Sequence, residues 1–327
     1  MGIIFKQSLK NTTITYLGFA IGAINVLFLY TRFLTEEYYG LVGVILSTSA
    51  ILMPLMAFGV PNTLVKYYSN FNDSKSTDGF LTLMVLLPLV IVIPLAGASY
   101  FANELIGNFL ARENIIVKDY VWNIFLIGMA MAYFEIFYAW SKVQMKSVFG
   151  NFMKEVFVRV GVSLLLILLY MGSISADFFL KALVVLYLLR TLLMKLYAFS
   201  LKRPKISFKW PENAGSIVNY SILIILGGST AVILLEIDRF MINQFIPIQN
   251  VAYYTVAIFI ATVIAVPARA MHQITYPMTA EIINRNDLTE LKKLYQKSSL
   301  TLFIVSGLIF ILILLNLNDF FALLPEA

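Results

Sequence analysis

Cysteine is absent from this chain of 327 residues, and histidine occurs only once. Without cysteine the chain can form neither a disulfide nor a thiolate metal site. Nucleophilic catalysis through histidine would depend on His272 alone, and no Gly-x-Ser-x-Gly motif accompanies it. The carboxylates do not cluster at ligand spacing, and no Walker A motif is present. We therefore expect no catalytic residues, no metal, no cofactor and no ATP-driven activity of this chain.

Charged side chains are also scarce, at 13% of residues, whereas 60% of residues are hydrophobic and the mean hydropathy is +0.84. Soluble domains carry roughly 25% charged and 45–50% apolar residues. A water-soluble core could not bury this much apolar surface, so most of the chain must lie in a lipid bilayer. The net charge of +6 therefore indicates membrane orientation and gives no reason to expect nucleic acid as a partner.

Long apolar runs predict about nine transmembrane helices, since roughly 20 apolar residues cross the hydrocarbon. We expect an all-α polytopic membrane protein. In the fourth span, Trp122 and Trp140 lie about 27 Å apart along a helix, which predicts one tryptophan in each interfacial belt. The predicted spans are residues 14–34, 41–65, 80–102, 120–141, 155–173, 178–200, 217–246, 251–277 and 299–317.

Lysine and arginine are distributed unevenly between the two sides of these spans. With the N-terminus in the cytoplasm, sixteen of them lie on the inner side, four on the outer side and four within spans. The positive-inside rule therefore predicts a cytoplasmic N-terminus.

The basic stretch "LKRPKISFKWPENAG" at 201–215 separates six predicted helices from three, and predicts a linker or a patch on anionic lipid. A small residue follows seven positions after Phe33 and again seven positions after Phe245, and the distance between the two phenylalanines equals one six-helix unit. This weak repeat favours two parallel lobes. We expect a six-helix lobe at 1–203, a linker at 204–215 and the first half of a second, truncated lobe at 216–327.

Two segments resemble the polysaccharide transporter (O-antigen flippase) branch of the multidrug/oligosaccharidyl-lipid/polysaccharide exporter superfamily. They are "RFLTEEYYGLVGVILSTSAILMPLMAFGVPNTLVKYYS" at 32–69 and "LLEIDRFMINQFIPIQNVAYYTVA" at 234–257, and the basic linker adds to the similarity. Ala252 stands where the family usually has glycine. The resemblance implies a two-lobe transporter that moves polyprenyl-pyrophosphate-linked oligosaccharide to the outer leaflet by alternating access, in a bacterial inner membrane.

Two alternatives stay open at this point. A cation-coupled multidrug exporter of the same fold would favour carboxylates over arginines in its cavity, whereas the predicted spans hold more arginines. A membrane-embedded polysaccharide polymerase or glycosyltransferase would be expected to have a large extramembrane loop, and the longest outer connection, about 103–119, is short. The coupling ion of a transporter could be H⁺ or Na⁺, and its other partners are membrane lipids.

Four arginines within predicted spans are the candidate substrate-binding residues. Charged residues inside a membrane are costly and usually face a cavity, and guanidinium groups bind phosphate oxygens in bidentate fashion. A cationic cavity would carry the pyrophosphate. The alternative is that Arg190 and Arg269 extend to the cytoplasmic interface. The four residues are Arg159, Arg190, Arg239 and Arg269.

Three carboxylates are the candidate charge partners. Glu135 is expected at the depth of Arg159, so these two side chains could neutralise each other. Glu236 is three residues before Arg239 and shares its helix face, whereas Asp238 points elsewhere and needs a partner on another helix or water. His272 is a candidate proton relay or an interfacial polar residue.

Overall fold

The structure, a computed structural model, describes residues 3–71, 74–203, 205–285 and 287–323. All regular elements among these residues are helical, which confirms an all-α polytopic membrane protein. Residue 204 of the predicted linker and residues 324–327 of the predicted second lobe lie outside the described residues. The predicted division into lobes stays a prediction.

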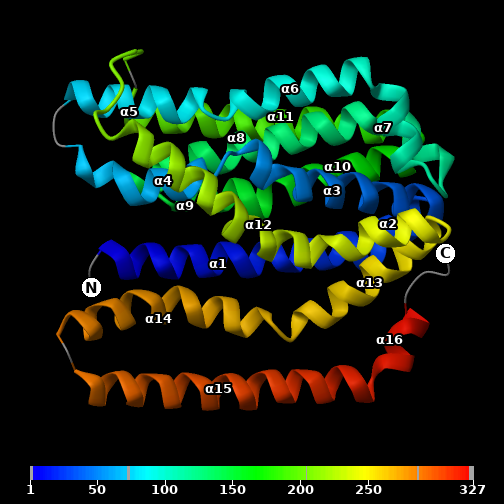
Figure 1. The fold of residues 1–327 in the computed structure, drawn as a ribbon. Helices are drawn as coiled ribbons and strands as arrows, with labels where there is room; N and C mark the ends of the chain where they lie inside the picture. The colour runs from blue at the N-terminus through cyan, green and yellow to red at the C-terminus, as the bar shows by residue number, and fades with distance from the viewer. Residues whose placement is uncertain (1–2, 72–73, 204, 286, 324–327) are drawn as a thin grey trace.

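Most helices follow one another with short connections and lie along one common direction (Figure 1), and a longer connection at 202–213 joins α11 to α12. The α-helices are α1 (Ile3–Ile24), α2 (Tyr30–Phe33), α3 (Glu36–Met56), α4 (Val60–Tyr67), α5 (Ser74–Leu86), α6 (Leu89–Phe101), α7 (Asn103–Leu110), α8 (Val121–Val143), α9 (Val148–Phe152), α10 (Val158–Tyr170), α11 (Ala176–Leu201), α12 (Ala214–Phe245), α13 (Gln249–Val263), α14 (Val266–Asn284), α15 (Leu288–Leu315) and α16 (Leu317–Leu323). Two π-helical segments, η1 (Asn25–Leu29) and η4 (Met153–Phe157), and two 3₁₀ segments, η2 (Tyr68–Asn70) and η3 (Ile115–Tyr120), complete them.

Seven helical segments of the described chain are long and apolar enough to cross a membrane, so the chain is a multi-pass membrane protein. The predicted span 155–173 belongs to the helical run α9–η4–α10, in which three charged residues lie close together. The predicted span 251–277 is divided between α13 and α14, and Pro267 occupies the second position of α14, where its missing N–H is tolerated. The seven segments are Leu9–Phe33, Glu36–Met56, Ser76–Phe101, Ile115–Val143, Ala176–Leu201, Ala214–Phe245 and Leu288–Leu315.

Several helix starts follow from local sequence. The side chains of Thr35, Ser175 and Asp287 precede α3, α11 and α15 and accept a hydrogen bond from a backbone N–H of the first turn. These residue types are the preferred N-caps because they satisfy donors that the helix itself leaves free. Between α3 and α4, Phe58 and Gly59 adopt positive φ angles of 51° and 66° and reverse the chain direction.

Helix α8 is the central helix of the bundle and packs against α3, α4, α6 and α11. Its buried residues contribute to all three apolar clusters of the core. Trp140 is fully buried in α8 and contacts Phe199 of α11 at 5.6 Å between ring centroids. The predicted position of Trp140 in an interfacial belt is therefore wrong: at this depth α8 is surrounded by other helices rather than lipid. Trp122, at the other end, is partly exposed.

We call the end of the bundle where α1 begins the inner end, because the charge distribution predicts that it faces the cytoplasm. The opposite end is the outer end.

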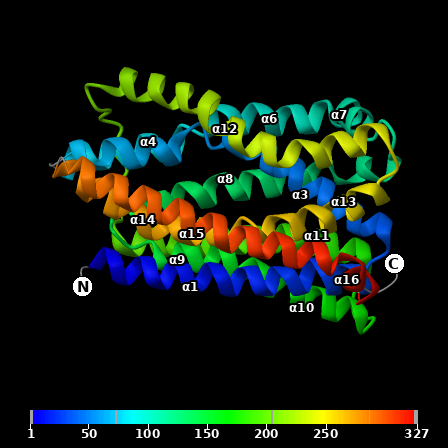
Figure 2. The ribbon, with the colours of Figure 1, turned by 90° about the horizontal axis from the view of Figure 1, so that it is seen from below.

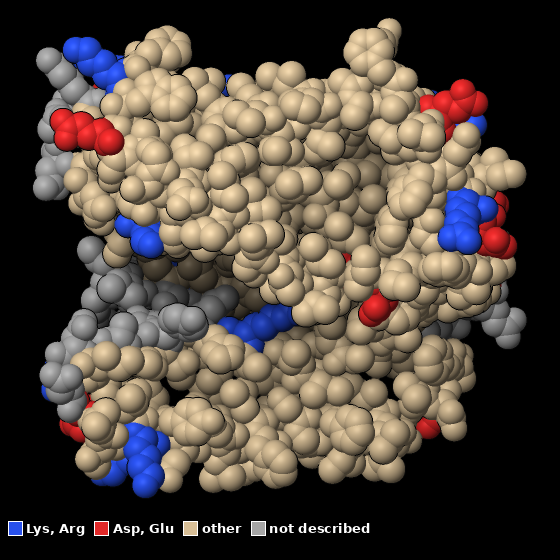
Figure 3. Space-filling view, viewed as in Figure 1, with Lys and Arg blue, Asp and Glu red and all other residues tan. Residues whose placement is uncertain are grey.

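Helices α14 and α15 form the layer farthest from α6 (Figure 1), and α15 lies on the surface beside α14 (Figure 2). None of the described residues of α15 is buried. The face seen in Figure 3 is hollowed between this layer and the upper bundle, with a basic side chain at the lower edge of the hollow.

Candidate functional site

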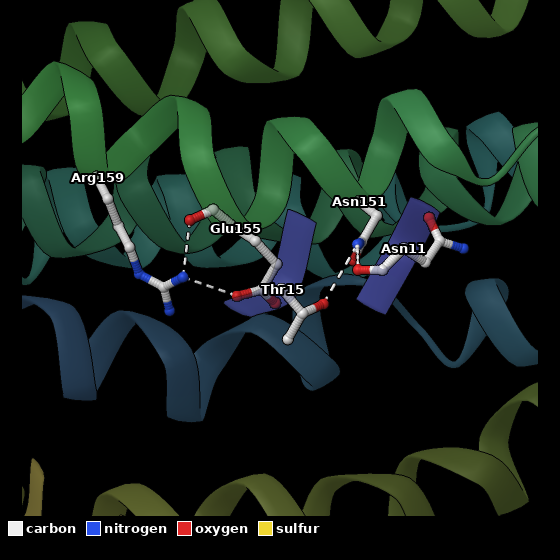
Figure 4. A network of polar contacts seen from close by, with 5 residues as sticks. All are labelled: Asn11, Thr15, Asn151, Glu155 and Arg159. Atoms are coloured by element: carbon white, nitrogen blue, oxygen red, sulfur yellow. Dashed lines mark hydrogen bonds and ion pairs between the residues drawn. The ribbon is translucent and has the colours of Figure 1, made fainter. Parts of the chain in front are cut away.

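A row of polar contacts joins α1 to the run α9–η4–α10 in the inner half of the bundle (Figure 4). The Asn151 amide donates to the Asn11 carbonyl oxygen at 3.0 Å and to the Thr15 hydroxyl at 3.4 Å. Farther along, the Asn25 amide donates to the Arg159 carbonyl oxygen at 2.8 Å, and Asn25 in turn accepts from a serine hydroxyl of α10. Such pairs satisfy polar groups that lipid could not.

Arg159 occupies a niche between η4 and two glycines of α1. Its Nη1 donates to the Glu155 carboxylate at 2.8 Å and to the Glu155 carbonyl oxygen at 2.7 Å. A Cβ atom at Gly18 would lie 2.5 Å from that carbonyl oxygen, and one at Gly22 would lie 3.0 Å from Arg159 Nε. The two glycines therefore let α1 approach the guanidinium closely, which is packing within the bundle.

Glu135 of α8 is paired with Lys154 of η4 at 2.6 Å. The alternative in which Glu135 and Arg159 neutralise each other is wrong, because Arg159 binds Glu155 on its own helical run instead. Besides Lys154, two further cations, Lys142 and Arg190, act electrostatically on Glu135.

We call these six residues, Glu135, Lys142, Lys154, Glu155, Arg159 and Arg190, the inner charge cluster. The cluster holds four cations and two carboxylates, so it carries a surplus of positive charge within a largely apolar bundle. Such a surplus suits an anionic ligand better than a closed set of ion pairs would.

A pocket of about 250 Å³ opens onto this cluster between α3, α4, α8, η4 and α12. We call it the inner pocket. Its charged lining is Glu135 and Lys154, and its polar lining includes Asn62 of α4 and Ser229 of α12. The side chain of Lys154 is 44% exposed and belongs to the pocket lining. The pocket therefore presents one accessible cation, amide and hydroxyl groups, and apolar walls.

The walls of the inner pocket are held together by close contacts between α4 and α12. The buried hydroxyls of Thr63 and Ser221 lie 2.8 Å apart and share a hydrogen bond. A Cβ atom at Gly59 would lie 2.3 Å from the Ser221 carbonyl oxygen, so glycine is required there for contact as well as for its positive φ. Pro54 and Pro61 also line the pocket, on either side of this turn.

Arg190 of α11 lies beside the pocket but is not among its lining residues. It is buried, and its guanidinium stacks on the rings of Phe134 at 4.1 Å and Tyr187 at 4.7 Å. Its Nε has no hydrogen-bond partner among the described residues. The alternative in which Arg190 extends to the cytoplasmic interface is therefore wrong, because aromatic faces hold the guanidinium inside the bundle.

The charged segment of α12 has the geometry predicted for it. Arg239 Nη1 donates to the Glu236 carboxylate on the same helix face, which confirms the predicted pair. Asp238 points to a different neighbour and accepts a hydrogen bond from the Tyr254 hydroxyl of α13. The Asp238–Tyr254 contact joins α12 to α13, whereas the Glu236–Arg239 pair lies within α12. None of these residues lines the inner pocket.

Arg269 and His272 belong to α14, and both are exposed. His272 lines a separate cavity of about 590 Å³ between α14 and α15, together with Lys292 and Tyr295 of α15. The four candidate arginines thus lie on four different helical runs, and the inner charge cluster unites only Arg159 and Arg190. The described residues contain no group of histidine, cysteine or carboxylate side chains that could hold a metal ion.

The outer ends of α3, α12 and α13 are held together by close contacts. The Asn114 amide donates to the Asn243 carbonyl oxygen at 2.8 Å and to the Ile246 carbonyl oxygen at 3.1 Å, while its oxygen accepts from the Ile248 N–H at 2.9 Å. A Cβ atom at Gly40 would lie 2.1 Å from the Ile248 carbonyl oxygen. We call this set of contacts the outer seam.

The description "Polysaccharide biosynthesis protein" belongs to a family model that matches residues 5–283. The match covers most of the chain, including the inner pocket and the outer seam. The chain belongs to this family. No curated protein and no solved structure gave a match. Family membership confirms the resemblance to polysaccharide transporters and supports a general role in polysaccharide export.

The sequence does not single out Lys142, Lys154 and Glu155 of the inner charge cluster, because hydropathy places the two lysines on the inner side of the membrane and Glu155 at the start of a predicted span. A signal was present: polar residues recur at every fourth position in this region, which places them on one helix face and indicates a polar interface. The residues are Ser147, Asn151, Glu155, Arg159 and Ser163. That pattern finds the α1 contact but not Lys154, whose place in the pocket depends on where α8 and α12 lie.

Proposed function

We propose that this protein is a flippase that moves polyprenyl-pyrophosphate-linked oligosaccharide from the inner to the outer leaflet, without making or breaking covalent bonds. The observation that carries the proposal is the inner pocket, in a member of a polysaccharide biosynthesis family. Lys154 is accessible there, with Arg190 behind it, so a pyrophosphate could replace part of the interaction with Glu135. The amide and hydroxyl groups of the lining suit sugar hydroxyls.

Closure of the outer seam and access to the inner charge cluster together support an inward-facing state of an alternating-access cycle. In this proposal the substrate enters from the inner leaflet of a bacterial inner membrane while its polyprenyl tail stays in lipid. The N-terminus faces the cytoplasm. The outer seam must then open for release, and H⁺ or Na⁺ could supply the driving force.

Among the arginines, Arg159 and Arg239 are already paired with carboxylates on their own helical runs. Arg190 forms no ion pair with the described residues, although its Nε and that of Arg239 both lack a hydrogen-bond partner there, and Arg269 is exposed on α14. We therefore propose that Lys154 meets the phosphates first, that Arg190 adds positive charge behind it, and that Arg239 and Arg269 contact the substrate only after the helices have moved. Glu135, Glu236 and Asp238 act as the charge partners.

The test is a leaflet-exchange assay in proteoliposomes that contain a fluorescent polyprenyl-pyrophosphate oligosaccharide. A membrane-impermeant quencher reports the fraction of label in the outer leaflet over time. We expect faster exchange than in protein-free vesicles and little acceleration for a fluorescent phospholipid without the glycan. Exchange no faster than in protein-free vesicles, with folded protein, would contradict the proposal.

A further inference from the structure

A second cavity, which we call the apolar pocket, lies in the outer half of the bundle between α3, α6, α7, α8 and α12. Its volume is about 330 Å³, and its walls are almost entirely aliphatic and aromatic. The polar side chains in its lining are Thr48 of α3 and Ser99 of α6. The Thr48 hydroxyl has no hydrogen-bond partner among the described residues.

Water is a poor occupant for such a cavity. A buried water molecule typically needs two to four polar partners, and apolar cavities of about 150 Å³ stay dry and take up hydrocarbon ligands instead. The apolar pocket offers two hydroxyls in more than twice that volume. Its lining therefore selects a hydrocarbon chain, and the bilayer around α6, α7 and α12 supplies one.

Aromatic side chains lie where α7 faces α12, at one edge of the apolar pocket. Phe109 of α7 and Phe240 of α12 belong to the lining, and their ring centroids lie 6.4 Å apart. Phe109 is 62% exposed, so this edge of the pocket lies at the surface of the bundle.

A cation lies beyond the aromatic pair, toward the outer end. The Arg112 guanidinium, two residues after the end of α7, lies 5.4 Å from the ring centre of Phe245, the last residue of α12. Arg112 is exposed and has no carboxylate partner among the described residues. An exposed cation above an apolar pocket complements a molecule with an anionic head and a hydrocarbon chain.

We propose that the apolar pocket binds one acyl chain of an outer-leaflet phospholipid, whose phosphate is held by Arg112. The bound chain fills the space between α7 and α12 and so stabilises the outer half of the bundle. This lipid site is separate from the inner pocket and does not depend on the proposed transport activity.

The test is photocrosslinking of the reconstituted protein with a phospholipid that carries a diazirine in its acyl chain, followed by peptide mass spectrometry. We expect label concentrated on lining residues of α6, α7 and α12. Ser99→Leu fills the pocket and should lower this labelling about tenfold, whereas Ala98→Leu, at the exposed neighbouring position, should leave it unchanged.

Arg112→Ala tests the head-group contact without changing the buried lining. The proposal can therefore be tested with this variant even if the Ser99→Leu protein does not fold. We expect several-fold weaker labelling, restored by Arg112→Lys. Label spread evenly over lipid-facing helices, or labelling unaffected by both Ser99→Leu and Arg112→Ala, would overturn the proposal. Competition with unlabelled lipids is the last check. If excess polyprenyl phosphate abolishes the labelling and excess unlabelled phospholipid does not, the proposal is overturned, because the site then binds an isoprenoid chain.

Discussion

At the scale of single residues, Lys154 is the most informative side chain of the inner pocket. It pairs with Glu135 at 2.6 Å while 44% of its side chain remains exposed. An ion pair in this position holds both charges where an incoming anion can compete for the cation. Arg159, by contrast, is enclosed by Glu155 and the glycines of α1 and supports the structure.

Lys154→Ala should lower glycan exchange in the proteoliposome assay by about tenfold or more, since it removes the accessible cation. Lys154→Arg keeps the charge and should retain most of the activity. Lys146→Ala, at an exposed position without an ion pair among the described residues, is the matched control. Unchanged exchange in folded Lys154→Ala protein would remove Lys154 from the site.

The niche of Arg159 makes a second prediction at this scale. Gly18→Ala places a methyl group against the Glu155 carbonyl and should lower the free energy of unfolding by about 1–3 kcal/mol. Gly97→Ala is the control, because nothing lies within 4 Å of a Cβ atom there. It should be neutral or slightly stabilising through helix propensity. Thermal unfolding in detergent micelles measures both, and equal melting temperatures would contradict the packing described for Arg159.

At the scale of helices, the structure separates a closed outer seam from an accessible inner pocket. Helix α3 takes part in both: its start packs against the connection between α12 and α13 at Gly40, and its last turn lines the inner pocket. Helix α12 likewise extends from the inner pocket to the outer seam. Movement of α12 relative to α3 would therefore change access at both ends together.

Asn114→Ala should loosen the outer seam, because Asn114 closes three backbone contacts around the connection between α12 and α13. Leaving such groups unpaired costs about 1–3 kcal/mol. The chain has no native cysteine, so a single Val251→Cys at a buried position reports opening cleanly. We expect maleimide to label this cysteine faster when Val251→Cys is combined with Asn114→Ala than when it is combined with Asn103→Ala, a control at an exposed position. Equal rates would mean that Asn114 does not hold the seam.

At the scale of the whole molecule, the orientation in the membrane decides at which end the proposed substrate would bind and at which end it would be released. The inner end carries most of the lysines and arginines, which predicts that it faces the cytoplasm. The proposed transport from inner to outer leaflet needs this orientation, because the inner charge cluster would otherwise face the wrong leaflet.

A membrane-impermeant maleimide checks the orientation in intact cells. Ser173→Cys, in the exposed turn before α11, should react directly. Ser200→Cys, at the other end of α11, should react only after the membrane is permeabilised. The reverse pattern would invert the predicted topology and, with it, the direction of the proposed transport.

The sequence by itself determined the membrane environment, most of the spans, the family and the Glu236–Arg239 pair. These depend on composition, on runs of apolar residues and on neighbours within one helix, all of which are local. Only the tertiary structure decided that Glu135 meets Lys154, that Trp140 is buried and that Arg190 stacks on Phe134. These contacts join segments far apart in the chain, and a hydropathy pattern sets the depth of a residue in the membrane but not which helix it faces.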